Sequence, residues 1–481
     1  MKLSCLSPQN HLPKVNSQTR LSLFFRLIPY SLSLIPLFVL PAFSQQTWRR
    51  TYGGSNDDQG YSVQQTQDGG YIVTGETYSF GAGAWNVYLI KTNASGDTLW
   101  TRTYGWSDGH LGNSVQQTSD GGYIIAGTYH NLEFGWDDVY IVKTNAAGDT
   151  LWTRTYGGAW NDQGYSVQQT SEGGYIIAGW TNSFGAGVYL IKTDASGDTL
   201  WTKTYGGSNA THGYSVQQTL DGGYIVTGTT SYGNGDVYLI KTDASGDTLW
   251  TRTYGGTNWD LGNSVHQTSD GGYIIAGFTY SFGPGWPDVY LIKTNASGDT
   301  LWTRAYGGTD YNVGNSIQQT SDGGYIVAGT TSSYGAGSFD VYLIKTNATG
   351  DTLWTRTFGR TGDDRGYSVQ QTTDVGYIVA GWNGYDVYLV KTDTNGFAGV
   401  EEKADSRGQM PDAGLRATPN PFTSFAWVPG HSSELFALYD ISGRKVGVYK
   451  GDRIGEGLGA GVYFLRPEGK DAKPLRIVKL R

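Results

Sequence analysis

The chain has 481 residues and a formal net charge of −8, with 72 glycines, 14 % aromatic residues and a single cysteine. Glycine does not recur at every third position and aromatic residues are plentiful, so collagen-like and disordered chains are both excluded. Residues 45–397 carry 17 Lys and Arg against 32 Asp and Glu, which excludes nucleic acid as a partner because a phosphate backbone is bound by a basic surface.

The first 44 residues are typical of a cleavable export signal. Four basic residues precede an apolar run from Leu27 to Phe43, and the small residues Ala42 and Ser44 predict cleavage between Ser44 and Gln45. The alternative is a permanent membrane anchor, but the run is short for about 30 Å of hydrocarbon and contains three prolines. No other segment is apolar enough to span a membrane, so we expect no stable transmembrane segment after processing. Cleavage would also remove Cys5.

Seven copies of one repeat fill residues 45–397. The copies open on tryptophans spaced by 52, 52, 49, 49, 52 and 52 residues, namely Trp48, Trp100, Trp152, Trp201, Trp250, Trp302 and Trp354. Each tryptophan segment is followed by segments that resemble Ser-Val-Gln-Gln-Thr, Gly-Gly-Tyr-Ile and Val-Tyr-Leu-Ile-Lys-Thr. All are short, rich in β-branched and aromatic residues, and bounded by Gly, Asp, Asn or Ser, which predicts four antiparallel strands per repeat.

The two ends of the array predict a closed ring. A period near 50 residues with four strands is typical of a β-propeller blade, whereas a coil of a β-solenoid takes about 20–30 residues. The array begins with a lone tryptophan-type strand at Trp48 and ends with a strand at Val387 to Thr392 that no such strand follows. Pairing these two strands completes the last blade and leaves no open sheet edge. The predicted fold is therefore all-β, a seven-bladed β-propeller closed by its N-terminal strand and followed by a small C-terminal β-sandwich.

The hairpin that reads Val-Tyr-Leu-Ile-Lys-Thr-Asn-Ala-Ser-Gly-Asp-Thr-Leu-Trp resembles the Thr-Gly…Trp signature of quinoprotein-like (PQQ-type) propeller repeats, and the resemblance covers all seven blades. Kelch repeats, which pair a Gly-Gly doublet with later Tyr and Trp, are the second resemblance. Both imply a propeller fold. The quinoprotein enzymes also imply a quinone pocket with metal ligands and, in many cases, a vicinal disulfide, which a ring without cysteine cannot form. We expect no cofactor.

The copies differ mainly in two of their links, those that precede the Ser-Val-Gln-Gln-Thr and the Val-Tyr-Leu-Ile-Lys segments. In an up-and-down sheet both links lie at the same end, so we expect a uniform turn face and a variable loop face, where binding usually resides. Flat aromatic rings beside carboxylates suit sugar rings. The ligand-binding candidates are Trp85, Trp106, Trp136, Trp160, Trp180, Trp259, Trp286, Trp382, Asp162 and Asp260. The alternative for each tryptophan is packing between blades.

No catalytic or metal-binding motif stands out. The six histidines fall at unlike positions, and the sequence has no zinc spacing, nucleophile elbow or phosphate-binding glycine loop. His266 replaces a glutamine of the innermost strand, where we expect a neutral residue that lines the channel. Three carboxylate pairs have the chemistry to bind calcium or to act as acid and base, but we expect solvated loop charges at Asp57/Asp58, Asp137/Asp138 and Asp363/Asp364.

A mixed-charge linker, 398–416, leads into a different segment, 417–481. This segment resembles the type A C-terminal sorting domain of the type IX secretion system through three motifs in the family's order: Pro419-Asn420-Pro421-Phe422, Tyr439-Asp440-Ile441-Ser442-Gly443-Arg444 and Gly461-Val462-Tyr463-Phe464-Leu465. The resemblance implies a Gram-negative bacterium and recognition by its secretion machinery. The segment between Phe422 and Leu435 departs from the family's regular pattern. A plain immunoglobulin-like accessory domain is the alternative.

We therefore expect a secreted or cell-surface propeller that binds a glycan or a protein through its loop face without catalysis. Two alternatives stay open. One is a glycoside hydrolase or lyase built around the channel, which a single essential carboxylate would reveal. The other is a purely structural surface protein.

Overall fold

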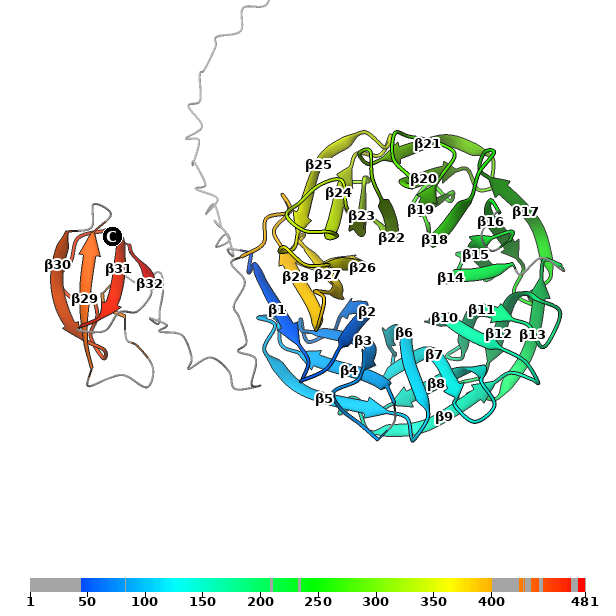
Figure 1. The fold of residues 1–481 in the computed structure, drawn as a ribbon, viewed down its shortest axis with the longest axis horizontal. Coiled ribbons are helices and arrows are strands. Elements are labelled where there is room, and N and C mark those ends of the chain that lie inside the picture. The colour runs from blue at the N-terminus through cyan, green and yellow to red at the C-terminus, as the bar shows by residue number, and fades with distance from the viewer. Residues whose placement is uncertain are drawn as a thin grey trace, which may run out of the picture. The chain divides into compact units, whose positions relative to one another are not determined.

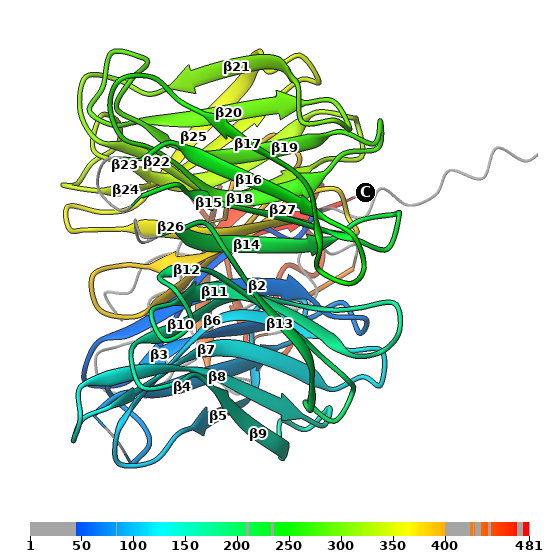
Figure 2. The same ribbon diagram turned by 90° about the vertical axis from the view of Figure 1, so that its right-hand side faces the viewer.

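The computed structural model describes residues 45–82, 84–207, 211–231 and 235–399, and in the C-terminal part residues 424–426, 428, 434–440, 444–468 and 475–480. Seven four-stranded antiparallel sheets, called blades 1 to 7, surround a central axis (Figure 1). Figure 2 shows the ring edge-on, with loops and turns projecting on its two faces. The predicted seven-bladed propeller is confirmed.

Each blade runs from an inner to an outer strand. Blade 1 consists of β2 (Asp58–Gln65), β3 (Tyr71–Thr77), β4 (Asn86–Thr92) and β5 (Thr98–Tyr104); blade 2 of β6 (Gly109–Gln117), β7 (Tyr123–Asn131), β8 (Trp136–Thr144) and β9 (Thr150–Tyr156). Blade 3 consists of β10 (Asp162–Gln169), β11 (Tyr175–Thr181), β12 (Gly187–Thr193) and β13 (Thr199–Tyr205); blade 4 of β14 (His212–Gln218), β15 (Tyr224–Thr229), β16 (Val237–Thr242) and β17 (Thr248–Tyr254). Blade 5 consists of β18 (Asp260–Gln267), β19 (Tyr273–Thr279), β20 (Asp288–Thr294) and β21 (Thr300–Tyr306); blade 6 of β22 (Asn312–Gln319), β23 (Tyr325–Thr331), β24 (Asp340–Thr346) and β25 (Thr352–Phe358). Blade 7 consists of β26 (Arg365–Gln371), β27 (Tyr377–Trp382), β28 (Val387–Thr392) and the N-terminal strand β1 (Trp48–Tyr52).

The ring closes between β1 and β28, which lie side by side in Figure 1. The two strands pair antiparallel, with Trp48 opposite Lys391 and Tyr52 opposite Val387. Gln45, just before β1, adds to the closure because its Oε1 accepts a hydrogen bond from the Thr394 amide at 3.0 Å. The predicted pairing of the first and last strands of the array is therefore confirmed.

The repeated aromatic residues join each blade to the next. The tryptophan of each outer strand packs on the tyrosine that begins the second strand of the following blade, with ring centroids 5.7 to 6.0 Å apart in all seven cases, from Trp48–Tyr71 to Trp354–Tyr377. Such aromatic pairs add about 1 kcal/mol each beyond the area they bury. Strands such as β3 are buried at every position because a neighbouring blade covers each face, and this explains why the sequence shows no polar face there.

All seven inner strands carry a β-bulge at the same place, between Gly60 and Ser62 in β2 and at the equivalent positions of the other blades. A bulge inserts one unpaired residue and changes the direction of its side chain. The inserted residues are Tyr61, Asn113, Tyr165, Tyr214, Asn263, Asn315 and Tyr367. The inner strands also begin earlier than predicted, so that Asp58, Asp162 and Asp260 lie in strands and not in loops.

The C-terminal part forms one four-stranded antiparallel sheet in the order β30-β29-β31-β32. Its strands are β29 (Leu435–Asp440), β30 (Lys445–Lys450), β31 (Gly461–Pro467) and β32 (Leu475–Lys479). The second layer of the predicted sandwich is not among the described residues; they add only an isolated bridge, Ala426–Ile454. Gly461, Val462 and Tyr463 of the predicted sorting motif begin β31, a central strand. The motif at 419–422 and Ser44 of the cleavage site lie outside the described residues. No helix that could span a membrane occurs in the described part of the chain.

Candidate functional site

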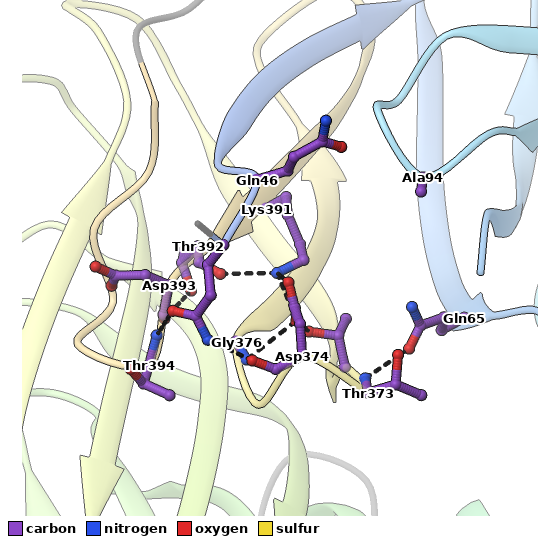
Figure 3. A network of polar contacts seen from close by, with 12 residues as sticks. Gln46, Gln65, Ala94, Thr373, Asp374, Gly376, Lys391, Thr392, Asp393 and Thr394 are labelled. Atoms are coloured by element: carbon purple, nitrogen blue, oxygen red, sulfur yellow. Dashed lines mark hydrogen bonds and ion pairs between the residues drawn. The ribbon is translucent and has the colours of Figure 1, made fainter. Parts of the chain in front are cut away.

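The turn face uses its charged residues to hold each blade together. The lysine near the end of each third strand is buried and pairs with the acidic residue of the turn between the first two strands. Figure 3 shows blade 7, where Lys391 Nζ lies 3.0 Å from both carboxylate oxygens of Asp374 and 2.9 Å from Thr392 O. The other six pairs are Lys91–Asp68, Lys143–Asp120, Lys192–Glu172, Lys241–Asp221, Lys293–Asp270 and Lys345–Asp322.

Each ion pair neutralises a buried lysine whose charge would be costly to bury without a partner. Burial by itself would raise the pKa of Asp120, but hydrogen bonds from Lys143, Thr118 and the Gly122 amide lower it to about 2. The sequence predicted tight turns at these positions but not the buried pairs. The available signal was that the lysine and the acidic residue recur together in every copy.

The loop face carries the predicted tryptophans. Four of them have large exposed fractions, namely Trp106 (42 %), Trp136 (39 %), Trp160 (50 %) and Trp286 (74 %). The other four are half-buried: Trp85, Trp180, Trp259 and Trp382. The loop face therefore presents aromatic surface in several blades.

The two predicted carboxylates lie beneath this face. Asp162 is fully buried, and its Oδ2 accepts hydrogen bonds from the Gly158 amide at 2.8 Å and from Ser183 Oγ at 2.6 Å. Asp260 makes the same two contacts in blade 5, at 2.8 and 2.7 Å. Each carboxylate joins the two variable loops of its blade from a buried position. Ligand contact by Asp162 and Asp260 stays a prediction.

Burial also corrects the expectation of solvated loop charges. Asp58 and Asp364 are 0 % and 2 % exposed. Asp58 shares its site with Asp386 of the neighbouring blade across Gly53, where a Cβ would lie 2.1 Å from Asp386 Oδ1 and 2.6 Å from Asp58 Oδ2. Only glycine fits there. Burial and the charges of Asp58 and Asp57 raise the pKa of Asp386 to about 6.

The same arrangement recurs between other blades. Burial and the charges of Asp162 and Asp137 raise the pKa of Asp138 to about 6. Between blades 5 and 6 an amide replaces one carboxylate, and Asn312 Nδ2 donates to Asp288 Oδ1 at 3.2 Å. In the described part of the chain no three His, Cys, Asp or Glu side chains gather in a way that could hold a metal ion.

Three of the predicted tryptophans make ring contacts in blades 1 to 3, in two groups. Trp136 and Trp160 meet edge-to-face with ring centroids 4.9 Å apart. Trp85 stacks on His130 at 5.7 Å and also contacts Tyr78 at 5.8 Å. These five residues, which we call the tryptophan cluster, come from the loops and strand ends of blades 1 to 3.

A chain of polar contacts leads from the tryptophan cluster toward the channel. His130 Nδ1 lies 2.5 Å from Asp137 Oδ1, and Gln163 Nε2 donates to Asp137 Oδ2 at 2.5 Å. The Tyr165 hydroxyl then donates to Gln163 Oε1. Asn161 Oδ1 accepts from the Asp137 amide at 3.0 Å. Because each group is held by another, these hydrogen bonds fix the positions of their side chains.

Aromatic residues continue this chain at the next blade junction. The Tyr165 and Tyr214 rings lie 5.2 Å apart, and Trp180 stacks on His212 at 4.8 Å with an interplanar angle of 4°. Burial lowers the pKa of His212 to about 4, so this imidazole is neutral at pH 7. The sequence missed Tyr165 and Tyr214 because the bulge that directs them is not visible in a strand pattern.

A second group lies at the junctions of blades 6, 7 and 1. Arg365 is placed over the Phe339 ring at 4.8 Å and near Trp382 at 5.9 Å. Tyr61 and Tyr367 pack at 5.3 Å, and the Tyr61 hydroxyl donates to a Glu76 oxygen at 2.6 Å. Burial raises the pKa of Glu76. Trp259 and Trp286 both contact Tyr280, away from the tryptophan cluster.

No protein-family profile and no curated protein matches the sequence. Among solved structures the chain is similar to the Pan2 WD40 domain of Neurospora crassa, with 9 % identity, a TM-score of 0.47, and coverage of 73 % of this chain and 95 % of that one. It is also similar to YCF48 from Cyanidioschyzon merolae, with 11 % identity, a TM-score of 0.45, and coverage of 71 % and 98 %. A third is Sqt1 from Chaetomium thermophilum, with 12 % identity, a TM-score of 0.44, and coverage of 90 % and 99 %. At these identities and TM-scores the likeness says nothing about a ligand.

Proposed function

We propose that the propeller binds a carbohydrate chain on its loop face, over blades 1 to 4, without catalysing a reaction. The observation that supports this function is the exposed Trp136–Trp160 pair beside the fixed Asp137 carboxylate. Aromatic rings give a sugar an apolar surface to stack on, and a small number of fixed polar groups set its orientation. The polar chain from His130 to Tyr165 supplies donors and acceptors for successive hydroxyl groups.

Glycan-array binding by the full chain tests this proposal. We expect binding that weakens by at least about tenfold in Trp136→Ala and in Trp160→Ala, since a stacked tryptophan contributes on the order of 1.4 kcal/mol or more to such a contact. Trp286→Ala is the matched control, because this tryptophan is also exposed but lies outside the tryptophan cluster. Equal losses in all three variants would contradict the proposed site.

The other interpretations give different results. If the ligand is a protein, the glycan array should show no binding. Capture of that protein should then be abolished in Trp136→Ala. An enzyme would turn over a polysaccharide, and one carboxylate substitution would stop it. A structural surface protein would show neither binding nor turnover, and its loss would disturb assembly of the cell surface.

We also propose that the chain is exported and reaches the outer cell surface of a Gram-negative bacterium through its C-terminal sorting-type domain. The support is the basic and apolar N-terminal segment with its small residues before Gln45, together with the three C-terminal motifs. N-terminal sequencing of the mature protein should begin at Gln45. Protease treatment of intact cells should remove the protein, and it should lose this accessibility when residues 417–481 are deleted.

A further inference from the structure

The central channel is lined by the inner strands of all seven blades. The lining alternates between Val or Ile and one polar residue per blade around a cavity of about 250 Å³. The polar residues are Gln64, Gln116, Gln168, Gln217, His266, Gln318 and Gln370. The described lining therefore contains six primary amides and one imidazole, and it contains no carboxylate.

The six amides are held in one orientation. Each Oε1 accepts a hydrogen bond, at 2.6 Å, from a backbone amide of the next blade, as in Gln117 N to Gln64 Oε1. The opposite orientation would place the Nε2 donor against an N–H donor. The hydrogen bonds therefore determine which atom of each side-chain amide is Oε1 and which is Nε2. Every Oε1 is therefore turned toward the protein.

The Nε2 atoms of the six glutamines face the channel. None of the six donates a hydrogen bond to a described protein group, and none is a buried unpaired atom, so all six keep contact with the cavity. A cavity of this size holds several waters. It presents N–H donors from six blades and no acidic side chain that would repel a negative charge.

We propose that this ring of glutamine amides binds a small inorganic anion on the axis of the propeller. N–H donors that bind an anion form stronger hydrogen bonds than neutral pairs do, and a concave array of such donors is a general solution for anion binding. The acidic residues of the two faces are screened by salt beyond about 10 Å. This inference goes beyond the proposed carbohydrate site and is independent of it.

The decisive variant is Gln64→Glu. A glutamate keeps an oxygen where Oε1 accepts the Gln117 amide, but it replaces the channel-facing donor with a charged acceptor. The matched control is Gln65→Glu, one residue along the same strand. Gln65 Oε1 accepts from the Thr373 amide at 2.8 Å and its Nε2 donates to Gly69 O at 3.4 Å, outside the channel lining.

The probe is chloride. Its binding to the full chain is measured as broadening of the chloride NMR signal, with bromide as competitor. We expect saturable broadening that bromide reverses, affinity reduced by at least about tenfold in Gln64→Glu because like charges repel, and unchanged affinity in Gln65→Glu. Crystals grown in bromide should show an anomalous peak on the channel axis. The absence of broadening in the wild type, a channel that holds only water, or an undiminished signal in Gln64→Glu would each overturn the proposal.

Discussion

Replacing His266 with glutamine should stabilise the propeller. At six of the seven blade junctions a glutamine Oε1 accepts the backbone amide of the next blade at 2.6 Å. At the junction of blades 5 and 6 the corresponding residue is His266, and the Gln319 amide has no such acceptor. His266 Nδ1 is itself buried without a hydrogen-bond partner.

The magnitude follows from these two observations. A restored hydrogen bond contributes about 0.5–1.5 kcal/mol, and removing a buried unpaired polar atom relieves a further cost of about 1 kcal/mol or more. We therefore expect His266→Gln to raise the free energy of unfolding by about 1.5–2.5 kcal/mol. For a domain of about 350 residues the unfolding entropy makes this a shift of roughly 2–3 °C in Tm, so urea unfolding at equilibrium is the better assay.

The effect should depend on pH with a defined sign. Burial lowers the pKa of His266 below its usual 6.5, so the unfolded chain takes up a proton before the folded chain does. Wild-type stability is then lost as pH falls through about 6.5, and His266→Gln lacks this loss. The difference between the two proteins should grow from pH 8 to pH 5.

His266→Ala serves as the control, because it removes the imidazole without supplying an acceptor for Gln319. The gap between His266→Gln and His266→Ala isolates the new hydrogen bond. A His266→Gln variant that is no more stable than the wild type at pH 8, or whose advantage shrinks as the pH falls, would contradict the role assigned to His266.

Three further substitutions test the comparison among blades. Val375 has φ of 60° where the other six turns have glycine, so Val375→Gly should raise the free energy of unfolding in urea by about 0.5–1 kcal/mol. A lower free energy of unfolding would show that the valine is not strained. Six outer strands end in a tyrosine whose hydroxyl donates to a glycine carbonyl of the next blade at 2.5 to 2.7 Å, whereas β25 ends in Phe358. Phe358→Tyr should add about 1 kcal/mol, and an unchanged Tm would mean that the hydroxyl does not reach the carbonyl. Asp386→Asn should stabilise by about 1–2 kcal/mol at pH 7, where the wild-type carboxylate is ionised despite its raised pKa of about 6. This advantage should disappear toward pH 4, because the wild type gains stability as Asp386 takes up its proton, and a constant advantage in a pH series of unfolding curves would contradict the assignment.

The sequence predicted the blades because their strands are defined locally. Hairpin turns, alternating β-branched residues and a tryptophan at a regular spacing are all properties of short segments. The closing pair was also predictable, since a lone first strand and a missing last strand leave one pairing that removes both edges. The bulge at Tyr61 and its equivalents was not predictable, because one extra residue leaves the strand pattern almost unchanged while it redirects the side chain.

The candidate site was predictable only as a face. The variable links placed Trp136 and Trp160 on the loop face, but nothing in the sequence showed that these two residues from adjacent blades make contact or that Asp137 joins His130 to Gln163. Asp162 and Asp260 were expected in loops, although the inner strands begin at these residues and bury them.

The number of blades, the closure of the ring and the variable face were thus predictable from local sequence, because they depend on hydrogen bonding between neighbouring strands and on the number of strand segments. Which side chains meet, which carboxylates are buried and which amide nitrogens face the channel became visible only in the folded ring. Those contacts join residues of adjacent blades, such as Asp137 and Gln163, 26 positions apart, and Gln64 and Gln117, 53 positions apart. They depend on how the curvature of the ring brings one blade against the next.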